Sequence, residues 1–435
     1  MKINEIIVFI ILMLAAQSAC ATNGYFMIGY GAKSIGLAGS GVALPQDRLV
    51  GALNPAGFSE VAAGWDFGMR MSRAVRKGAF DCRGIFACND VVDDRSSREV
   101  FVVPNFGWSR HLSERSSVGV TVYGNGGINT TYGRNFYTET AARIMGGRPG
   151  DPGFPRTGKI GVDFTQLFIA PSFAYKVGDN HSVGISPIFG VRRFSTRGFE
   201  VFAPISSDPT SLTGRGTDYS VGGGVRVGWI GRLSDSFALG AQYTSPVWFQ
   251  RAVKYNGLLA NGGEFNAPQH YTLGLAWSAT PRLDIAFDVQ RILWGEVDSL
   301  ANTGPTAAEL QGMITPARML GANGTIGFGW IDQTIFKLGL SYRHSDRFTL
   351  RTGWNHGSSQ IPNRETLLNV IAPATINDNA TVGFSVKIAN YGELSATYMR
   401  AFEKKNRNRA TAFFGTSVSA SIVQDWLDVA WSADF

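Results

Sequence analysis

Apolar and polar side chains alternate along several segments in the second half of the chain. Residues 283–289, 334–343 and 381–388 each place apolar side chains at every second position, as in Phe336, Leu338, Leu340 and Tyr342. A period of two is typical of a β-strand with one apolar face. Because soluble sandwiches and membrane barrels both show it, alternation alone does not distinguish them.

The connections between strands do distinguish them. Every second connection is short, near 111–116, 177–181, 233–235, 280–281, 344–346 and 389–391, and the others run to roughly 20–40 residues, as in bacterial outer-membrane barrels. The sequence therefore predicts an all-β fold, a transmembrane barrel of 14 antiparallel strands. We expect these strands at 63–73, 98–109, 117–127, 162–176, 182–194, 219–232, 236–248, 270–279, 282–294, 333–343, 347–356, 378–388, 392–402 and 424–435.

Both ends of the chain agree with export to the outer membrane. Residues 1–21 combine Lys2, an apolar run at Ile6–Leu14 and small residues at 19–21, which predicts a cleaved signal peptide. The last strand ends in Phe435 and keeps strict alternation, as in the signal read by the barrel-assembly machinery. After residue 21 no apolar run reaches the ~20 residues of a membrane-spanning helix, so any span must use strands.

Residues 22–62 do not follow the strand pattern. They are rich in Gly and Ala and precede the first convincing strand. The apolar side chains of Phe26, Met27, Ile28 and Leu37 favour burial. We therefore expect a hatch at 22–62 that plugs the lumen, followed by the barrel at 63–435.

Charge and cysteine content exclude other classes. The net charge is +7, but basic residues are scattered except at Lys404–Arg409, where we expect a lipopolysaccharide-facing loop and not a nucleic-acid site. Cys82 and Cys88 are expected to form a local disulfide, since an exported chain favours oxidation and Asp81 and Asp90 supply too few ligands for a metal site. We expect no metal and no cofactor.

Four blocks of sequence carry a resemblance to a known family. They are Gly31–Gly57 with its Asn54-Pro55-Ala56, Tyr123–Thr130, Tyr255–Leu258 with Phe265–Pro268, and Asn369–Thr375. Together, in this order, they resemble the FadL/TodX family of outer-membrane transporters for long-chain fatty acids and other hydrophobic compounds. The resemblance implies a hatch that carries Asn54, Pro55 and Ala56, and a lateral opening where the third strand kinks.

The residues of the third strand are consistent with such a kink. Gly124, Gly126 and Gly127 lack side chains, so the strand is able to bend and leave its ladder there. A simple exit from strand to loop is the alternative.

Two further sets of residues are candidates for ligand contact. Strand phase directs five basic side chains inward: Arg70, Arg226, Lys337, Arg351 and Lys387. One or two of them are expected to meet a ligand carboxylate. The rest are expected to pair with inward acids such as Asp66, Asp284 and Asp288. The loop 133–160, with a short helix expected at 139–145, supplies an apolar groove or packs on itself through Phe136, Tyr137, Ile144, Met145 and Phe154.

These features favour passive uptake of hydrophobic small molecules, with long-chain fatty acids first, through hatch rearrangement and sideways release at the third strand. Alternatives are an aromatic-hydrocarbon channel of the same architecture or an adhesive, structural barrel. A hydrophilic porin is excluded by the plug. The chain has 5 histidines and no nucleophile and carboxylate gathered around them in sequence, so we expect no enzyme. We expect a monomer.

Overall fold

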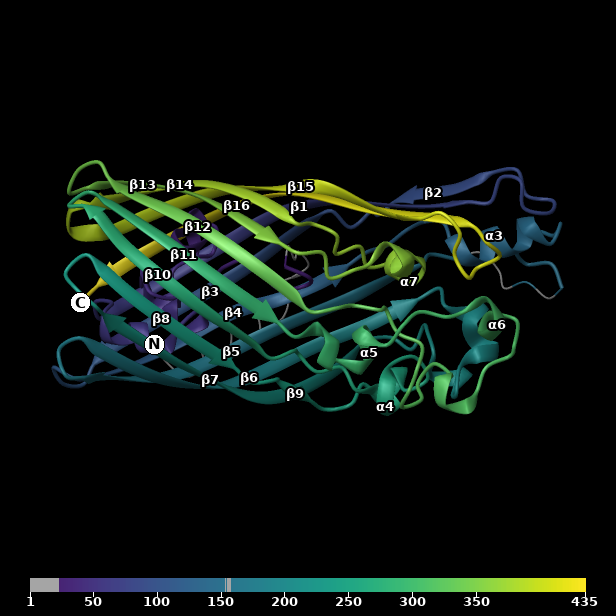
Figure 1. The fold of residues 1–435 in the computed structure, drawn as a ribbon, viewed down its shortest axis with the longest axis horizontal. Helices are drawn as coiled ribbons and strands as arrows, with labels where there is room; N and C mark the ends of the chain where they lie inside the picture. Colours follow the sequence, from purple (N-terminus) through teal and green to yellow (C-terminus); the bar gives the residue numbers. More distant parts are fainter. Residues whose placement is uncertain (1–22, 153, 155–157) are drawn as a thin grey trace.

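The computed structural model describes residues 23–152, 154 and 158–435, which form a closed antiparallel β-barrel (Figure 1). The last strand pairs with the first along its whole length, from Gly64 opposite Asp434 to Asp81 opposite Ser417. The predicted 14-stranded barrel is confirmed. Its wall strands are β1 (Gly64–Asp81), β3 (Val100–His111), β4 (Ser116–Asn129), β5 (Gly161–Val177), β6 (His181–Arg197), β7 (Asp218–Arg232), β8 (Phe237–Thr244), β10 (His270–Thr280), β11 (Leu283–Ile292), β12 (Gln333–Arg343), β13 (Phe348–Gly357), β14 (Asp378–Ile388), β15 (Gly392–Asn408) and β16 (Ser417–Asp434).

The two ends of the barrel differ. Tight turns connect the strands at the end where the C-terminus lies, and long loops with short helices crowd the other end (Figure 1). Among the described residues no helix is long and apolar enough to cross a bilayer. The helices of the loop end are α3 (Phe136–Ile144), η3 (Glu200–Ile205), η4 (Pro209–Ser211), η5 (Val253–Tyr255), α4 (Ala260–Gly263), η6 (Trp294–Glu296), α5 (Asp298–Ala301), α6 (Ala307–Leu310), η7 (Pro316–Arg318), η8 (Asn363–Glu365) and α7 (Thr366–Asn369), while η9 (Ala389–Tyr391) lies in a tight turn.

Alternation gives the wall two different faces. On β1, Phe67, Met69 and Met71 are exposed on the outside, whereas Asp66 and Arg70, in the alternate positions, are buried inside. The same division on the other strands makes an apolar outer belt around a polar lumen, as a bilayer requires.

Several strands depart from the predicted bounds. β1 and β15 run further toward the loop end, so Lys404–Asn408, predicted to be a loop, belongs to a strand. β8 is shorter than predicted because it stops before Pro246, which has no N–H for the ladder. The chain resumes pairing with β7 as β9 (Trp248–Phe249), and a further short strand, β2 (Val91–Arg95), extends the sheet beside β1.

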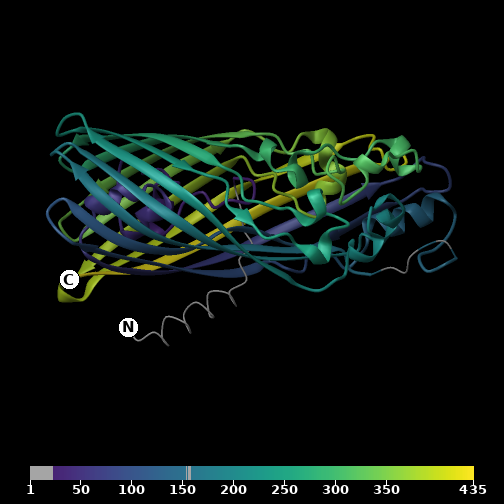
Figure 2. The ribbon, with the colours of Figure 1, turned by 90° about the horizontal axis from the view of Figure 1, so that it is seen from below.

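The N-terminal segment fills the lumen. Residues 23–62 form α2 (Ala32–Gly36), η1 (Arg48–Ala52) and η2 (Pro55–Ser59), almost all buried, and both views show this purple segment inside the ring of strands near the tight-turn end (Figures 1 and 2). This is the predicted hatch. The predicted signal peptide, residues 1–21, lies outside the described residues.

Candidate functional site

Asn54 joins two parts of the hatch to the barrel wall. Its side-chain oxygen accepts a hydrogen bond from the Ala56 N–H at 3.1 Å, which caps η2. Its Nδ2 donates to the carbonyl of Val42 at 2.8 Å and to the carbonyl of Trp229 in β7 at 3.0 Å. Asn54 is fully buried, so each of these bonds also satisfies a group that water does not reach.

Glycines in the wall make room for this hatch segment. A Cβ on Gly228 of β7 would lie 1.9 Å from Oδ1 of Asn54, and one on Gly184 of β6 would lie 2.4 Å from the backbone at 55–56. Asn54, Pro55 and Ala56 therefore sit in a seat formed by the wall strands, and the hatch is built to dock there.

The third wall strand, β4, separates from β3 about halfway along its length and stays paired with β5. Phe106–His111 of β3 pair with Ser117–Val122 of β4. In the part of the chain that the structure describes, Val100–Asn105 pair with β1 on one side and have no strand pairing to β4 on the other. The upper half of β4, Tyr123–Asn129, stays paired with β5.

A bulge and a contact with the hatch accompany this separation. The register of β4 against β5 shifts between Gly124 and Gly126, which leaves Asn125 as the extra residue. The hatch bonds to β4 at that point: the Gly127 N–H donates to the carbonyl of Tyr25 at 3.1 Å, and the Met27 N–H donates to the carbonyl of Asn125 at 3.2 Å. The hatch thus takes part of the place beside β4 that β3 leaves.

The break in pairing is bounded above as well as below. Beyond it, the Ser97 N–H donates to the carbonyl of Thr131 at 2.8 Å. Arg76 of β1 donates from Nη1 to the carbonyl of Asn129 at 3.1 Å, and its guanidinium lies 5.5 Å from the ring centre of Phe101. The wall therefore has a bounded interruption between β3 and β4, with a buried cation on its border.

An apolar cavity lies beside the upper half of β4. Its empty space, together with its opening to solvent, is about 530 Å³, and apart from Thr196 and Ser299 its lining is apolar. Six of the lining side chains are aromatic: Phe164, Phe194, Phe199, Phe265, Phe328 and Trp330. The other apolar lining residues are Ile128, Val162, Leu258, Leu259, Leu300, Ile371 and Ala372. The family-like blocks at 255–268 and 369–375 therefore both contribute to the lining of the cavity.

Further spaces lie on either side of the cavity. Toward the loops, a space of about 370 Å³ shares Phe199, Leu258, Ser299 and Phe328 with it. Toward the lumen, another space of about 370 Å³ lies between the hatch and the wall and includes Phe26. The Tyr25 ring packs on Phe164 of the cavity at 4.9 Å and on Phe26 at 5.2 Å. The start of the hatch therefore separates the cavity from the lumen.

Four of the five predicted inward cations bind the hatch. Arg226 donates to the carbonyl of Gly51 at 2.7 Å, and Lys337 donates to the carbonyl of Ile28 at 3.0 Å. Arg351 donates to Oε1 of Gln46 at 3.2 Å, and Arg70 to the carbonyl of Gly29 at 3.4 Å.

Acids accompany two of these cations. Arg70 also pairs with Asp428 at 2.8 Å, and Lys337 lies opposite Asp288 in the register of β12 and β11. Lys387, the fifth candidate, is exposed at the tight-turn end of β14. Ligand contact by these cations stays a prediction, and their partners in this structure are hatch groups and acids.

Two buried arginines near the cavity and the interruption were missed. Arg192 lies 5.8 Å from the ring centre of Phe265, a cavity residue, and donates to Oγ of Ser220 at 2.8 Å. It shares the inward phase of Ser186 in β6, so strand phase was sufficient to find it. Arg76 was missed because the first strand was predicted to end at residue 73, and residues outside a predicted strand have no inward or outward phase.

The predicted loop groove is largely buried. Phe136, Tyr137 and Ile144 belong to the packed interior around α3, where Phe136 stacks on Phe80 at 5.7 Å. Met145 is exposed and Phe154 partly so. Self-packing, the alternative considered for this loop, describes the first three side chains. Contact with ligand stays a prediction for the other two.

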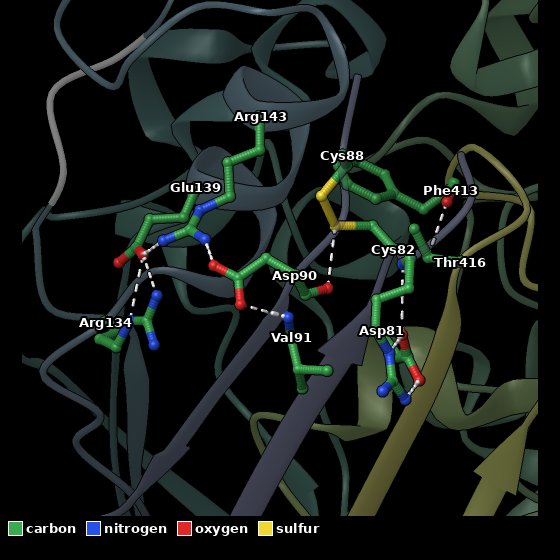
Figure 3. The surroundings of a disulfide bond; sticks show 11 residues. Asp81, Cys82, Cys88, Asp90, Val91, Arg134, Glu139, Arg143, Phe413 and Thr416 are labelled. Atoms are coloured by element: carbon green, nitrogen blue, oxygen red, sulfur yellow. Dashed lines mark hydrogen bonds and ion pairs between the residues drawn. A yellow bond between two sulfur atoms is a disulfide. The ribbon is translucent and has the colours of Figure 1, made fainter. Parts of the chain in front are cut away.

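Cys82 and Cys88 form a disulfide in the hairpin between β1 and β2 (Figure 3). Asp90, next to this hairpin, makes an ion pair with Arg143 of α3. Arg134, which precedes this helix, pairs with Glu139 in it at 2.7 Å. The disulfide hairpin therefore supports the loop that follows β4, the strand that carries the bulge. Among the described residues, no three His, Cys, Asp or Glu side chains lie close enough together to hold a metal ion.

Buried charges hold the lower side of the hatch. Lys33 pairs with Glu393 of β15 at 2.6 Å, and Arg48 pairs with Asp66 of β1 at 3.3 Å. Asp47 accepts from the Leu49 N–H at 3.0 Å as the cap of η1. Burial, together with the nearby negative charge of Asp66, raises the pKa of Asp47 to about 7.

A closed barrel with an apolar belt, a lumen plugged by its own N-terminus and an apolar cavity at the plug defines an outer-membrane transport protein for hydrophobic compounds. Comparison with protein families agrees. The family described as "Outer membrane protein transport protein (OMPP1/FadL/TodX)" matches residues 12–424. The chain belongs to this family, which consists of outer-membrane transporters and not of enzymes.

Solved structures show the same fold. The toluene transporter TodX of P. putida has a TM-score of 0.65 at 16% identity, over 94% of this chain and 99% of that one. A FadL homologue of Pseudomonas aeruginosa has 0.66 at 14% identity, over 95% and 100%. The toluene transporter TbuX of Ralstonia pickettii has 0.60 at 16% identity, over 93% and 98%. The search of curated proteins finds no match.

Proposed function

We propose that this protein takes up small, uncharged hydrophobic compounds, with aromatic hydrocarbons as the best fit, by passive diffusion. The observation that carries this proposal is the apolar cavity beside Tyr25 and the upper half of β4. Six aromatic rings and two hydroxyl groups line it, so an apolar ring gains burial there and leaves no polar group unsatisfied.

The proposed route runs from the loops to the interruption in the wall. The outer space passes a ligand to the cavity, and displacement of Tyr25 and Phe26 from Gly126 opens the way toward the break between β3 and β4. This step requires the hatch to move, since Tyr25 and Phe26 lie between the cavity and the lumen. Release is sideways into the membrane, where an apolar compound is more soluble than in water.

Long-chain fatty acids, favoured by the sequence, are the second candidate. An ionised carboxylate in this cavity would lose its hydration without a charged partner among the lining residues, which is costly. Arg192, beside Phe265, and Arg76, at the interruption, are buried cations beside the proposed path. A fatty acid would have to keep its carboxylate at one of them while its chain occupies the cavity.

A transport experiment separates these ligands. Purified protein in liposomes, or the gene in a deletion strain, is tested for uptake of toluene and of oleate. We expect protein-dependent entry of toluene to exceed that of oleate. Equal entry of both compounds would contradict the preference for aromatic hydrocarbons, and greater entry of oleate would make the fatty acid the better ligand. No protein-dependent entry of either compound would refute the transport of both ligand classes.

A cavity-filling variant tests the site itself. Ala372 lines the cavity, so Ala372→Trp should lower toluene uptake by about tenfold through overpacking. The matched control is Ala380→Trp on the outer face of β14, opposite Arg400, which should transport normally. Both variants should keep the heat-modifiable migration of a folded barrel. Normal uptake by Ala372→Trp would remove the cavity from the route.

A further inference from the structure

Basic side chains form a row on the outside of four neighbouring strands. The register places Arg95 of β2 opposite Lys77 of β1, Lys77 opposite Ser421 of β16, and Ser421 opposite Lys405 of β15. The three basic side chains are exposed. Because neighbouring strands are about 4.8 Å apart, the row spans about 14 Å. We call Arg95, Lys77 and Lys405 the outer basic row.

The outer basic row lies just above the apolar belt, on the loop side. Below it, Met71 of β1 and Leu427 of β16 face outward. Phe402, three residues before Lys405, is exposed and contacts the exposed ring of Trp354 at 5.6 Å. Exposed aromatic rings at this height mark the interface between hydrocarbon and headgroups. The row is therefore level with the headgroups of the outer leaflet, at the end of β2 that points away from the loops and near the loop end of β15 (Figure 1).

The neighbouring acids neutralise only part of this surface. Arg95 pairs with Glu99 at 2.5 Å, and Arg400, two outward rows below, pairs with Asp425 at 2.7 Å. In the described part of the chain, no ion pair includes Lys77 or Lys405. Asp93, on the same face of β2, is opposite Ala79 and not opposite a cation.

Cross-strand like charges give a physical reason for an anion here. Lys77 and Arg95 are directly opposite each other on the same face, where like charges repel. Glu99 supplies a counter-charge to Arg95 but not to Lys77. A phosphate beside Lys77 would supply the counter-charge that this side chain lacks among the described residues. Arg95 offers its planar group and Lys77 and Lys405 offer flexible ammonium groups, which are the side chains that bind phosphate in proteins.

We propose that the outer basic row binds the phosphate groups of the phosphorylated glycolipid of the outer leaflet, lipopolysaccharide. Val75 and Val423 face outward directly below the row, between Lys77 and Arg73 on β1 and beside them on β16. The apolar surface below the row would receive the acyl chains of the same molecule. Below Val75 and Val423 a row of Arg73, Asp425 and Arg400 precedes the exposed Met71 and Leu427. The closeness of the cations to this apolar surface favours a lipid-borne phosphate over a free ion, because a free ion makes no contact with apolar side chains. The proposal is independent of the ligand that the barrel transports.

Binding of lipid A to the full-length mature protein in detergent, measured by native mass spectrometry, tests this proposal. The variant Lys77→Gln/Lys405→Gln should lose about tenfold or more of its affinity for bis-phosphorylated lipid A, since each basic residue near anionic lipid contributes to binding. Arg110→Gln/Arg115→Gln removes the same charge at the tight-turn end, where both side chains are exposed, and should bind as the parent does. Lys77→Arg/Lys405→Arg should retain binding.

Each outcome decides the matter. Weaker binding by the glutamine variant alone, together with weak binding of dephosphorylated lipid A by the parent, supports the site. Equal binding by the parent and the glutamine variant overturns it, as does equal binding of the dephosphorylated lipid. Complete displacement by an equal concentration of inorganic phosphate would show a free-ion site and also overturn the proposal. All variants are exposed substitutions, and heat-modifiable migration checks that each barrel is folded.

Discussion

Single residues in this protein are constrained by how closely the hatch approaches the wall. Gly126 is the tightest case, since a Cβ there would lie 1.8 Å from the carbonyl oxygen of Tyr25. The sequence indicated that Gly124, Gly126 and Gly127 allow a bend. It did not indicate that Gly126 is needed for contact with a segment 100 residues earlier, because that contact exists only when the barrel is closed.

Gly126→Ala should therefore release the start of the hatch. The methyl group cannot coexist with the Tyr25 carbonyl in its present place, so the bond from Gly127 N–H to Tyr25 should be lost. We expect faster hydrogen exchange at 25–27 and a barrel that still migrates as folded. Gly223→Ala in β7 is the matched control, because its nearest neighbouring atom is 3.9 Å from the added carbon. Unchanged exchange at 25–27 in Gly126→Ala would contradict this account.

Among elements, the strands were predictable and their side-chain partners were not. Phase correctly directed Arg70, Arg226, Lys337 and Arg351 inward, because alternation is a property of each strand. Their hatch partners depend on how residues 23–62 fold inside the lumen. The end of β8 at Pro246 was readable from the sequence in principle, since proline breaks a ladder.

Lys337→Met distinguishes a hatch anchor from a ligand-binding cation. It removes the donor to the Ile28 carbonyl and leaves the opposing Asp288 without its cation, so we expect the hatch to loosen. Toluene and oleate uptake should then change by the same factor, with increased proteolysis of the hatch. Lys387→Met, at an exposed position, should change neither. A selective loss of oleate uptake with an unaltered hatch would instead assign Lys337 to the ligand carboxylate.

On the scale of the whole molecule, barrel and hatch are held in different ways. The wall closes through the long pairing of β1 with β16, whereas the hatch is held by short stretches of backbone bonding, individual side-chain bonds and buried ion pairs. Such an arrangement allows the hatch to move while the wall stays intact.

Hatch docking should weaken as the pH rises. The pKa of Asp47 is about 7 in the docked hatch against 3.8 for the free group, so the docked form binds more protons between these values. Docking should be most stable below about pH 4 and lose stability as the pH rises toward 7, with no further loss from this group above about pH 8. The charges acting on Asp47 are Asp66, which raises its pKa, and Lys33 and Arg351, which lower it.

Hydrogen exchange of residues 47–53, corrected for the intrinsic effect of pH, measures this dependence. Asp47→Asn keeps a side-chain oxygen for the Leu49 N–H but does not titrate, so its exchange should not vary across the same range. A pH dependence in Asp47→Asn equal to that of the parent would assign the effect to another group.

The sequence by itself determined the barrel, its number of strands, the inward phase of four of the five cations and the existence of an N-terminal plug. These features are written in local periodicity, connection length and composition, which do not depend on distant contacts. Only the tertiary structure decided where β4 leaves β3, which hatch groups the cations hold and which rings enclose the cavity. Those features depend on contacts between residues far apart in the chain, which form only when the barrel closes. A local sequence pattern does not predict such contacts.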